Sequence, residues 1–184
     1  GLAEDSMYCY RTRYRDTGLA WSDWSDPMPF MTTQTQSTDN LLTNPGAESG
    51  SMGWTVTDGY LEYLQAGECD GVDPYSGSYY FAVGALCSTS DYAEAYQDVS
   101  LLTYENCIAQ GGGYIYYGGY LSNWGGSDHP EAVVAFLDSD GNEIIRTDQI
   151  STYNNYWTNL FGSSVVPENT VTARMILMGT KYSG

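Results

Sequence analysis

The chain is divided into short runs with a period of two, separated at close intervals by turn residues. The clearest unit spans 132–150, where two apolar runs flank the turn at 138–142. The Asp-Gly pair in this turn supplies the positive φ that a tight hairpin needs. Strand-like runs of this kind, without the longer helical stretches of β-α-β units, are typical of a sandwich. The pattern predicts an all-β protein.

Strand patterns continue through most of the region from residue 40, and only 101–110 is expected to form a short helix. Trp54 follows a Gly turn at a strand start and is expected in the core. Consecutive Tyr116 and Tyr117 must face opposite sides of a sheet, so one of the two is expected to be buried. The expected strands are 41–43, 54–66, 79–86, 94–101, 113–123, 132–137, 143–150, 157–166 and 170–178.

The charge of the chain excludes several classes of partner. Six Lys+Arg against 23 Asp+Glu give a formal net charge of −17. Such a field repels phosphate backbones and anionic lipid, so no binding to nucleic acid or membrane surfaces is expected. No apolar run reaches the length of about 18 residues that a spanning helix needs. Partners are therefore expected to be neutral sugars, cations or other proteins. Acidity that only maintains solubility stays an alternative to a role linked to calcium.

The residues for catalysis are not assembled in this sequence. His129 is the only histidine, so no Ser-His-Asp or Cys-His set can be built without further partners. The carboxylate pairs Asp138/Asp140 and Asp70/Asp73 lie in Gly-containing turns, where Asp is placed for backbone capping. We therefore expect no enzyme activity.

The four cysteines indicate an oxidising compartment. No C-x-x-C occurs, and one His is too few for a Cys/His zinc site. Cys69 and Cys87 lie in Gly-, Asp- and Ser-rich segments that read as loops, and a disulfide between them is predicted. It would close a loop of roughly 18 residues and stabilise the fold by about 3 kcal/mol. This predicts an extracellular or cell-surface location. Cys9 and Cys107 either pair across the two regions or stay unpaired as small buried hydrophobes.

The first region has the pattern of a hairpin. Residues 8–15 alternate Tyr and Thr with Cys and Arg, a turn follows at 16–18, and a second strand ends at 30–32. The segment 10–32 resembles the last two strands of a fibronectin type III module, and Trp-Ser-Asp-Trp-Ser at 21–25 resembles the cytokine-receptor motif. This resemblance implies that Arg11, Arg13 and Arg15 stack on Trp21 and Trp24, either as a receptor surface or as a ladder that rigidifies the module.

These features predict a domain order. Residues 1–33 are expected to be the C-terminal part of a fibronectin type III-like, immunoglobulin-like sandwich, and 34–39 a linker. From residue 40, the sequence N-P-G-x-E followed by G-W at Gly53-Trp54 resembles the start of galactose-binding-domain-like jelly rolls. Carbohydrate-binding modules of secreted glycoside hydrolases share this start. The resemblance covers 40–184 and implies a jelly-roll β-sandwich that lacks its last strand, because the sequence stops at KYSG before the acidic closing strand that the family usually has.

The jelly-roll resemblance also implies a structural Ca²⁺. Its ligands would be Glu48, Gly77 and Ser78, although the Asp of the missing strand has no counterpart. Asp70 and Asp73, in the acidic loop around Cys69, are a second calcium candidate because carboxylates suit this ion. Ordinary turn chemistry is the alternative for both places.

The main functional hypothesis is a non-catalytic carbohydrate-binding or adhesion module of a secreted or surface multidomain protein. Aromatic faces stack on sugars, Asn and Asp bond the hydroxyls, and loops usually carry function. For each aromatic residue, packing is the alternative. The predicted ligand-binding residues are Tyr120, Asn123, Trp124, Asp128, Tyr153, Asn155, Tyr156 and Trp157.

Two other functions are considered. Incomplete sheet edges at both ends favour a structural subunit of an extracellular filament or surface assembly, with strands completed by neighbouring protein subunits. The region could also be an inert spacer beside an enzyme elsewhere in the polypeptide.

Overall fold

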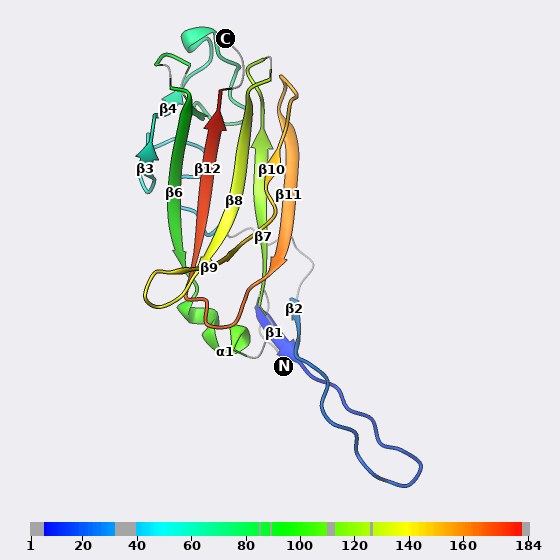
Figure 1. The fold of residues 1–184 in the computed structure, drawn as a ribbon. Coiled ribbons are helices and arrows are strands. Elements are labelled where there is room, and N and C mark those ends of the chain that lie inside the picture. Colours follow the sequence, from blue (N-terminus) through cyan, green and yellow to red (C-terminus); the bar gives the residue numbers. More distant parts are fainter. Residues whose placement is uncertain are drawn as a thin grey trace.

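The computed structural model describes residues 6–31, 40–84, 86–88, 90–109, 113–125 and 127–181. They form a β-sandwich and a two-stranded arm that projects from it (Figure 1). Among these residues no helix is both long and apolar enough to cross a membrane. The elements are β1 (Met7–Tyr10), β2 (Met28–Met31), β3 (Thr55–Asp58), β4 (Leu61–Leu64), η1 (Glu68–Asp70), β5 (Tyr80–Val83), β6 (Tyr92–Ser100), η2 (Leu102–Tyr104), α1 (Glu105–Ile108), β7 (Tyr114–Leu121), β8 (His129–Leu137), β9 (Glu143–Arg146), β10 (Ile150–Ser151), β11 (Thr158–Val165) and β12 (Thr172–Thr180).

One layer of the sandwich is a continuous antiparallel sheet. Its order is β10-β8-β12-β6-β3, and β9 also pairs with β8. The central strand β12 pairs along its whole length with both neighbours, so that Met175 lies between Gln97 and Val134. This sheet has an apolar cluster on each face. A second cluster around Val133 and Ile176 covers the outer face, where Tyr92 and Tyr96 pack against it.

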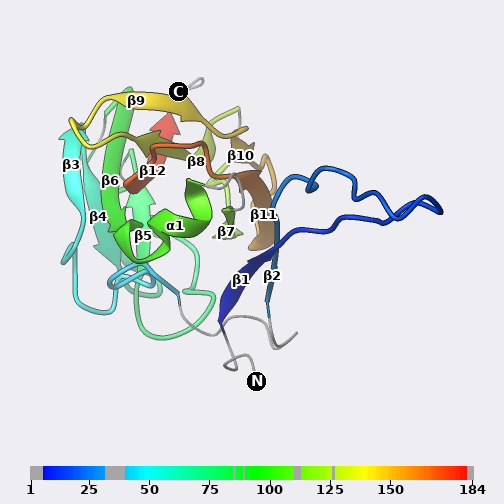
Figure 2. The ribbon, with the colours of Figure 1, turned by 90° about the horizontal axis from the view of Figure 1, so that it is seen from below.

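The other layer is divided into two strand pairs. β4 pairs with β5, and β7 pairs with β11, but no ladder joins β5 to β7 among the described strands. Figure 2 shows these four strands on the side of the sandwich opposite β6, β12 and β8. Trp54, Tyr117, Phe136 and Met175 are buried between the layers, as predicted for Trp54. Tyr117 is 7% exposed whereas Tyr116 is 79% exposed, which confirms their opposite orientation.

Most of the strands expected from the sequence are present, with three differences. Residues 41–43 do not form a strand, because the side chain of Gln97 hydrogen-bonds both backbone groups of Thr43 in place of a sheet partner. The run expected at 54–66 is interrupted at Gly59, whose φ is +55 and whose backbone lies against Tyr92, so a larger residue would clash there. The run expected at 143–150 forms two strands, β9 and β10.

The N-terminal region forms the expected hairpin. Tyr8 pairs with Phe30 near its base, and an isolated bridge joins Arg15 to Trp21 near its tip. The turn lies between Arg15 and Trp21, and in it Asp16 Oδ1 accepts the N–H of Ala20 at 2.9 Å. Figures 1 and 2 show that this arm extends away from the sandwich. Residues 32–39, including the predicted linker, lie outside the described residues.

The side chains of the arm form the expected stack. The Arg13 guanidinium lies 4.2 Å from the Trp21 ring centroid and 4.4 Å from that of Trp24, and Arg15 lies 5.5 Å from Trp21. Ser22 and Ser25 fix the second strand, since their hydroxyls accept the backbone N–H groups of Tyr14 and Thr12. The stacking is therefore confirmed for Arg13 and Arg15 but not for Arg11. Because two strands alone are marginal in water, these contacts explain how the arm keeps its form without a core.

Candidate functional site

A cavity of about 760 Å³ lies between β5 and β7, where the second layer is divided. Its floor is apolar, with Met175 and Leu177 of β12 and Ala132 of β8. Its rim carries four aromatic side chains, Tyr75, Tyr120, Trp124 and Trp157. The cavity therefore exists because β5 and β7 do not share a ladder, and the rim residues come from loops and strand ends on both sides of it.

The loop 68–75 bridges the two halves of this layer. Trp124, just after β7, donates its indole N–H to the Asp70 carbonyl at 3.0 Å. Trp157, just before β11, donates to the Asp73 carbonyl at 2.7 Å. The ring of Tyr75 stacks on that of Tyr120, with centroids 3.5 Å apart and planes 15° apart. A hydrogen bond to the Tyr120 hydroxyl raises the pKa of Tyr75.

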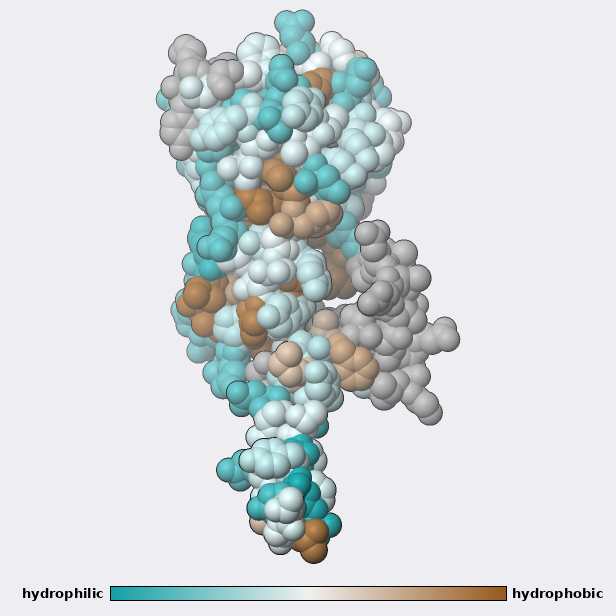
Figure 3. All heavy atoms as spheres, turned by 90° about the vertical axis from the view of Figure 1, so that its right-hand side faces the viewer, coloured by the Kyte–Doolittle hydropathy of each residue, from teal (hydrophilic) through white to brown (hydrophobic). Residues whose placement is uncertain are grey.

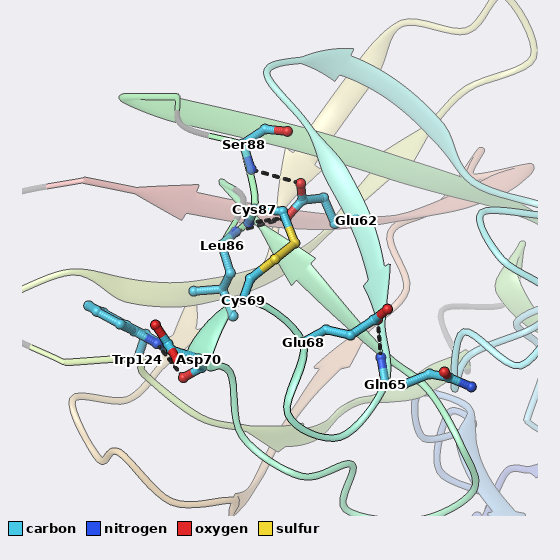
Figure 4. Close-up of a disulfide and its surroundings, with 9 residues drawn as sticks. All are labelled: Glu62, Gln65, Glu68, Cys69, Asp70, Leu86, Cys87, Ser88 and Trp124. Carbon is cyan, nitrogen blue, oxygen red and sulfur yellow. Dashed lines mark hydrogen bonds between the residues drawn. A yellow bond between two sulfur atoms is a disulfide. The ribbon is translucent and has the colours of Figure 1, made fainter.

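The predicted disulfide is present and attaches this loop to the segment that follows β5. Cys69 and Cys87 are bonded across 18 residues, with their Cα atoms 5.2 Å apart. The Glu62 carboxylate accepts the backbone N–H groups of Leu86, Cys87 and Ser88 at 2.8–3.0 Å (Figure 4). Burial raises the pKa of Glu62, but these hydrogen bonds outweigh it and the net pKa is lowered.

The remaining cysteine prediction is settled only in part. No cysteine is free within the described part of the chain, which excludes a free thiol at Cys9. The side chain of Cys107 lies outside the described residues.

Tyr80 places a hydroxyl without a partner beneath the loop. Its side chain is 7% exposed, and its oxygen has no hydrogen-bond partner among the described residues. Gly71 packs directly against this oxygen, so no side chain fits at that position. Burial, and then the negative charges of Glu68, Glu62 and Asp73, raise the pKa of Tyr80.

The outward face of β7 and β11 is aromatic and carries no charge. Neither strand contains a charged residue. The strands pair from Tyr114 with Val165 to Leu121 with Thr158, and alternate residues point outward. Figure 3 shows the side on which β11 lies, with separate apolar patches among neutral and hydrophilic side chains. We call this surface the β7–β11 face; its outward residues are Tyr114, Tyr116, Gly118, Tyr120, Asn159, Phe161, Ser163 and Val165.

The structure brings five of the eight predicted ligand-binding residues together in the cavity lining. They are Tyr120, Asn123, Trp124, Asp128 and Trp157. Asn123 is 3% exposed, and its side chain accepts the N–H of Gly125, so it organises the turn. Asp128 is half-buried in the cavity wall.

The other predicted loop, 153–157, lies partly elsewhere. The Tyr153 ring packs against that of His129, with centroids 4.7 Å apart. Asn155 and Tyr156 are exposed and are not part of the cavity lining. His129 Nε2 lies 2.9 Å from Glu131 Oε1, which also accepts a hydrogen bond from Gln149.

The two predicted calcium places show different local contacts. Glu48 Oε1 accepts the backbone N–H groups of Ser78 and Tyr79 at 2.8 and 3.0 Å, and Gly77 lies directly against this carboxylate. Asp70 and Asp73 contribute backbone carbonyls to the two indoles. Within the described part of the chain, no group of three or more His, Cys, Asp or Glu could hold a metal ion. Calcium stays a prediction both at Glu48, Gly77 and Ser78 and at Asp70 and Asp73.

Sequence reasoning missed Tyr75, Tyr80 and Phe161. Phe161 could have been found, because the period of two in this strand places it on one face together with Asn159, Ser163 and Val165. Tyr75 could not, since its partner Tyr120 is 45 residues away and the contact depends on how the loop folds back.

No family model and no curated protein matches the chain. Among solved structures, the enzymatically active domain of tailspike protein 4 of bacteriophage CBA120 is similar over 79% of this chain, with 19% identity and a TM-score of 0.53. This chain spans only 20% of that protein. TmCBM61, solved in complex with β-1,4-galactotriose, is similar over 80% of this chain and 91% of its own length, with 18% identity and a TM-score of 0.50.

At these identities the similarity concerns the fold. It confirms the predicted β-sandwich, of the kind found in carbohydrate-binding modules. Neither similar structure is a fibronectin type III module, so that interpretation of residues 1–33 stays a prediction. The chain is an all-β protein whose sandwich has the fold of a carbohydrate-binding module.

Proposed function

We propose that this chain is a non-catalytic carbohydrate-binding module that binds a neutral glycan on the β7–β11 face and the aromatic rim beside it. The observation that carries the proposal is the absence of charge on this face, in a chain whose formal net charge is −17. A surface left neutral amid so many carboxylates suits a ligand that is itself uncharged.

The chemistry of the face suits a polyhydroxylated ligand. Tyr116 and Phe161 are 79% and 65% exposed, so their rings are available for stacking on the C–H faces of a sugar. Asn159 and Ser163 are exposed beside them and can exchange hydrogen bonds with hydroxyl groups. At the rim, the exposed face of Trp124 adds another stacking surface.

Three further observations support an extracellular binding module without catalysis. The Cys69–Cys87 disulfide is suited to an oxidising compartment. The ring nitrogens of His129 are engaged by Glu131 and the Ser127 carbonyl, and the Asp138 carboxylate accepts the N–H groups of Asp140 and Asn142 in its turn. The fold is shared with a module that was solved with a bound galactotriose.

The test is a neutral-glycan array followed by isothermal titration. We expect Tyr116→Ala and Trp124→Ala each to weaken binding at least several-fold, since one aromatic ring contributes on the order of 1 kcal/mol. Tyr60→Ala is the matched control, because Tyr60 is 51% exposed and lies between β3 and β4, outside the β7–β11 face. Absence of binding to every neutral glycan at millimolar concentration would overturn the proposal.

A second candidate function, a subunit of an extracellular assembly, is favoured by the arm. Trp21 and Trp24 are 53% and 54% exposed, and Trp and Arg are the residues that most often anchor protein interfaces. The arm also carries three of the six Lys+Arg side chains, whereas the sandwich is acidic. Concentration-dependent association in sedimentation velocity, abolished by Trp24→Ala, would support this function, and a monomer at all concentrations would exclude it.

A further inference from the structure

The β7–β11 face is closed at one end by the loop 68–75. Leu121 and Thr158 pair at this end of the two strands. Trp124 lies three residues beyond β7, Trp157 lies one residue before β11, and both donate their indole N–H groups to this loop. The loop is therefore attached to side chains that flank both strands at this end of the face.

Tyr75 covers the outward residue nearest this end. Tyr120 is the last outward side chain of β7, and one face of its ring is occupied by the ring of Tyr75 at a centroid distance of 3.5 Å. Tyr120 is accordingly only 39% exposed, whereas Tyr116, four residues earlier on the same face of β7, is 79% exposed. A chain lying along β7 from Tyr116 covers about 14 Å before it reaches Tyr120 and meets Tyr75.

The loop is held too firmly to move aside easily. The Cys69–Cys87 disulfide ties it to the segment after β5, and Glu62 fixes that segment through three backbone hydrogen bonds. Glu68 folds back to accept the N–H of Gln65 at 2.8 Å, and Gly71 packs on Tyr80. Figure 4 shows how the disulfide, Glu62 and Trp124 hold the loop from different sides.

From this geometry we infer that the site binds the end of a neutral polysaccharide chain and not its middle, with the loop 68–75 as the wall that determines this specificity. The inference rests on the proposed function and adds to it the class of ligand. The terminal sugar would meet the exposed face of Tyr75, which is 52% exposed, and the ring of Trp124, which is 61% exposed.

The charge of the wall further restricts the terminal sugar. Glu68, Asp70 and Asp73 all lie in the wall, so a terminal uronate or a sulfated sugar would be repelled. An uncharged sugar has no such cost.

The experiment asks whether the binding capacity of a polysaccharide follows the number of its chain ends or its mass. β-1,4-Galactan, xylan and a mixed β-glucan serve as probes, each intact and after partial hydrolysis to shorter chains, and isothermal titration gives the binding capacity per gram. We expect the capacity to rise in proportion to the number of chain ends, so that halving the chain length doubles it. A capacity that follows the mass and is unchanged by hydrolysis would overturn the inference but leave the proposed function standing.

Two variants separate the wall from the face. Tyr75→Ala removes the ring that closes the end of the face. We expect this variant to bind more sites per gram of intact polymer, so that its capacity approaches a value set by the mass of the polymer and not by its chain ends. Tyr116→Ala weakens binding to the intact and the hydrolysed probe equally, because it removes a stacking ring without opening the end. If Tyr75→Ala leaves the ratio of the two capacities unchanged, the loop is not the wall. If no probe and no array glycan binds the unmodified chain, the proposed function itself fails.

Discussion

Glu62 shows how one carboxylate can stabilise a loop at the scale of a single residue. Glu62→Gln keeps the shape of the side chain but replaces the charged acceptor, and we expect a loss of roughly 1 kcal/mol at pH 7. For a chain of this size that corresponds to a decrease of about 2–4 °C in the melting temperature.

The loss of stability in Glu62→Gln should depend on pH, in a direction set by the sign of the Glu62 pKa shift. The pKa of Glu62 is lowered in the folded state from its ordinary value of 4.5. Its stabilisation is therefore complete above pH 4.5 and is lost as the pH falls through the lower, folded-state pKa. In thermal melts, the difference in melting temperature between Glu62→Gln and the unmodified protein should be smaller at pH 3 than at pH 7. Glu168→Gln is the control, since Glu168 is exposed and its side chain makes no hydrogen bond to another described residue.

The Tyr80 hydroxyl leads to a prediction of the opposite sign. A buried hydroxyl without a partner costs about 1–3 kcal/mol of desolvation. Tyr80→Phe removes this group and keeps the ring contact with Trp157, whose centroid is 5.8 Å away. We expect an unchanged or higher melting temperature and unchanged glycan binding. A decrease of several degrees would contradict the absence of a partner for this hydroxyl.

At the scale of elements, the Cys69–Cys87 disulfide should link stability to binding. The double variant Cys69→Ser/Cys87→Ser opens a loop of 18 residues, for which the chain-entropy model gives a loss of about 3 kcal/mol. Because the loop also carries Tyr75, we expect weaker glycan binding at temperatures where the variant is still folded. Denaturant unfolding measures the loss of stability. Titration at roughly 10–15 °C below the thermal transition of the variant measures the loss of glycan binding. Full stability in the variant would contradict this role.

The arm should behave as an element independent of the sandwich. Arg13→Ala removes the guanidinium between Trp21 and Trp24, and we expect faster amide exchange at Tyr14 and Ser22 and an altered near-UV spectrum. The melting temperature of the sandwich should stay within about 1 °C, because cation–π contacts in an exposed hairpin contribute on the order of 1 kcal/mol to that hairpin alone. Arg11→Ala is the matched control. Equal exchange in both variants would show that the stack does not hold the arm.

The elements also show what sequence can and cannot predict. Alternation and turn residues were sufficient for β6, β7, β8, β11 and β12, because those signals are local. The separation of β5 from β7 was not predictable, since pairing between strands is a non-local property. The cavity and the Tyr75–Tyr120 stack follow from that separation. Trp124 and Trp157 were predicted for the site from their position in loops, but their shared contact with the loop 68–75 becomes visible only in three dimensions.

At the scale of the whole molecule, the acidic charge should have little influence on the proposed ligand. The field of −17 charges acts on ions, whereas a neutral glycan carries none. We expect the glycan affinity to change by less than about twofold between roughly 50 and 500 mM NaCl. Titration at the two salt concentrations measures this. A strong salt dependence would indicate a charged ligand and would argue against a neutral glycan.

The two indole hydrogen bonds at the loop 68–75 have a practical consequence. Trp124 is solvent-exposed on one face while its N–H is fixed to Asp70, so its emission should respond to anything that displaces water from that face. Trp54 is buried, and the other two tryptophans outside this pair lie in the arm. The chain therefore contains its own optical reporter at the place where a sugar would arrive, and unlabelled glycans can be screened by the quenching or blue shift of the tryptophan emission.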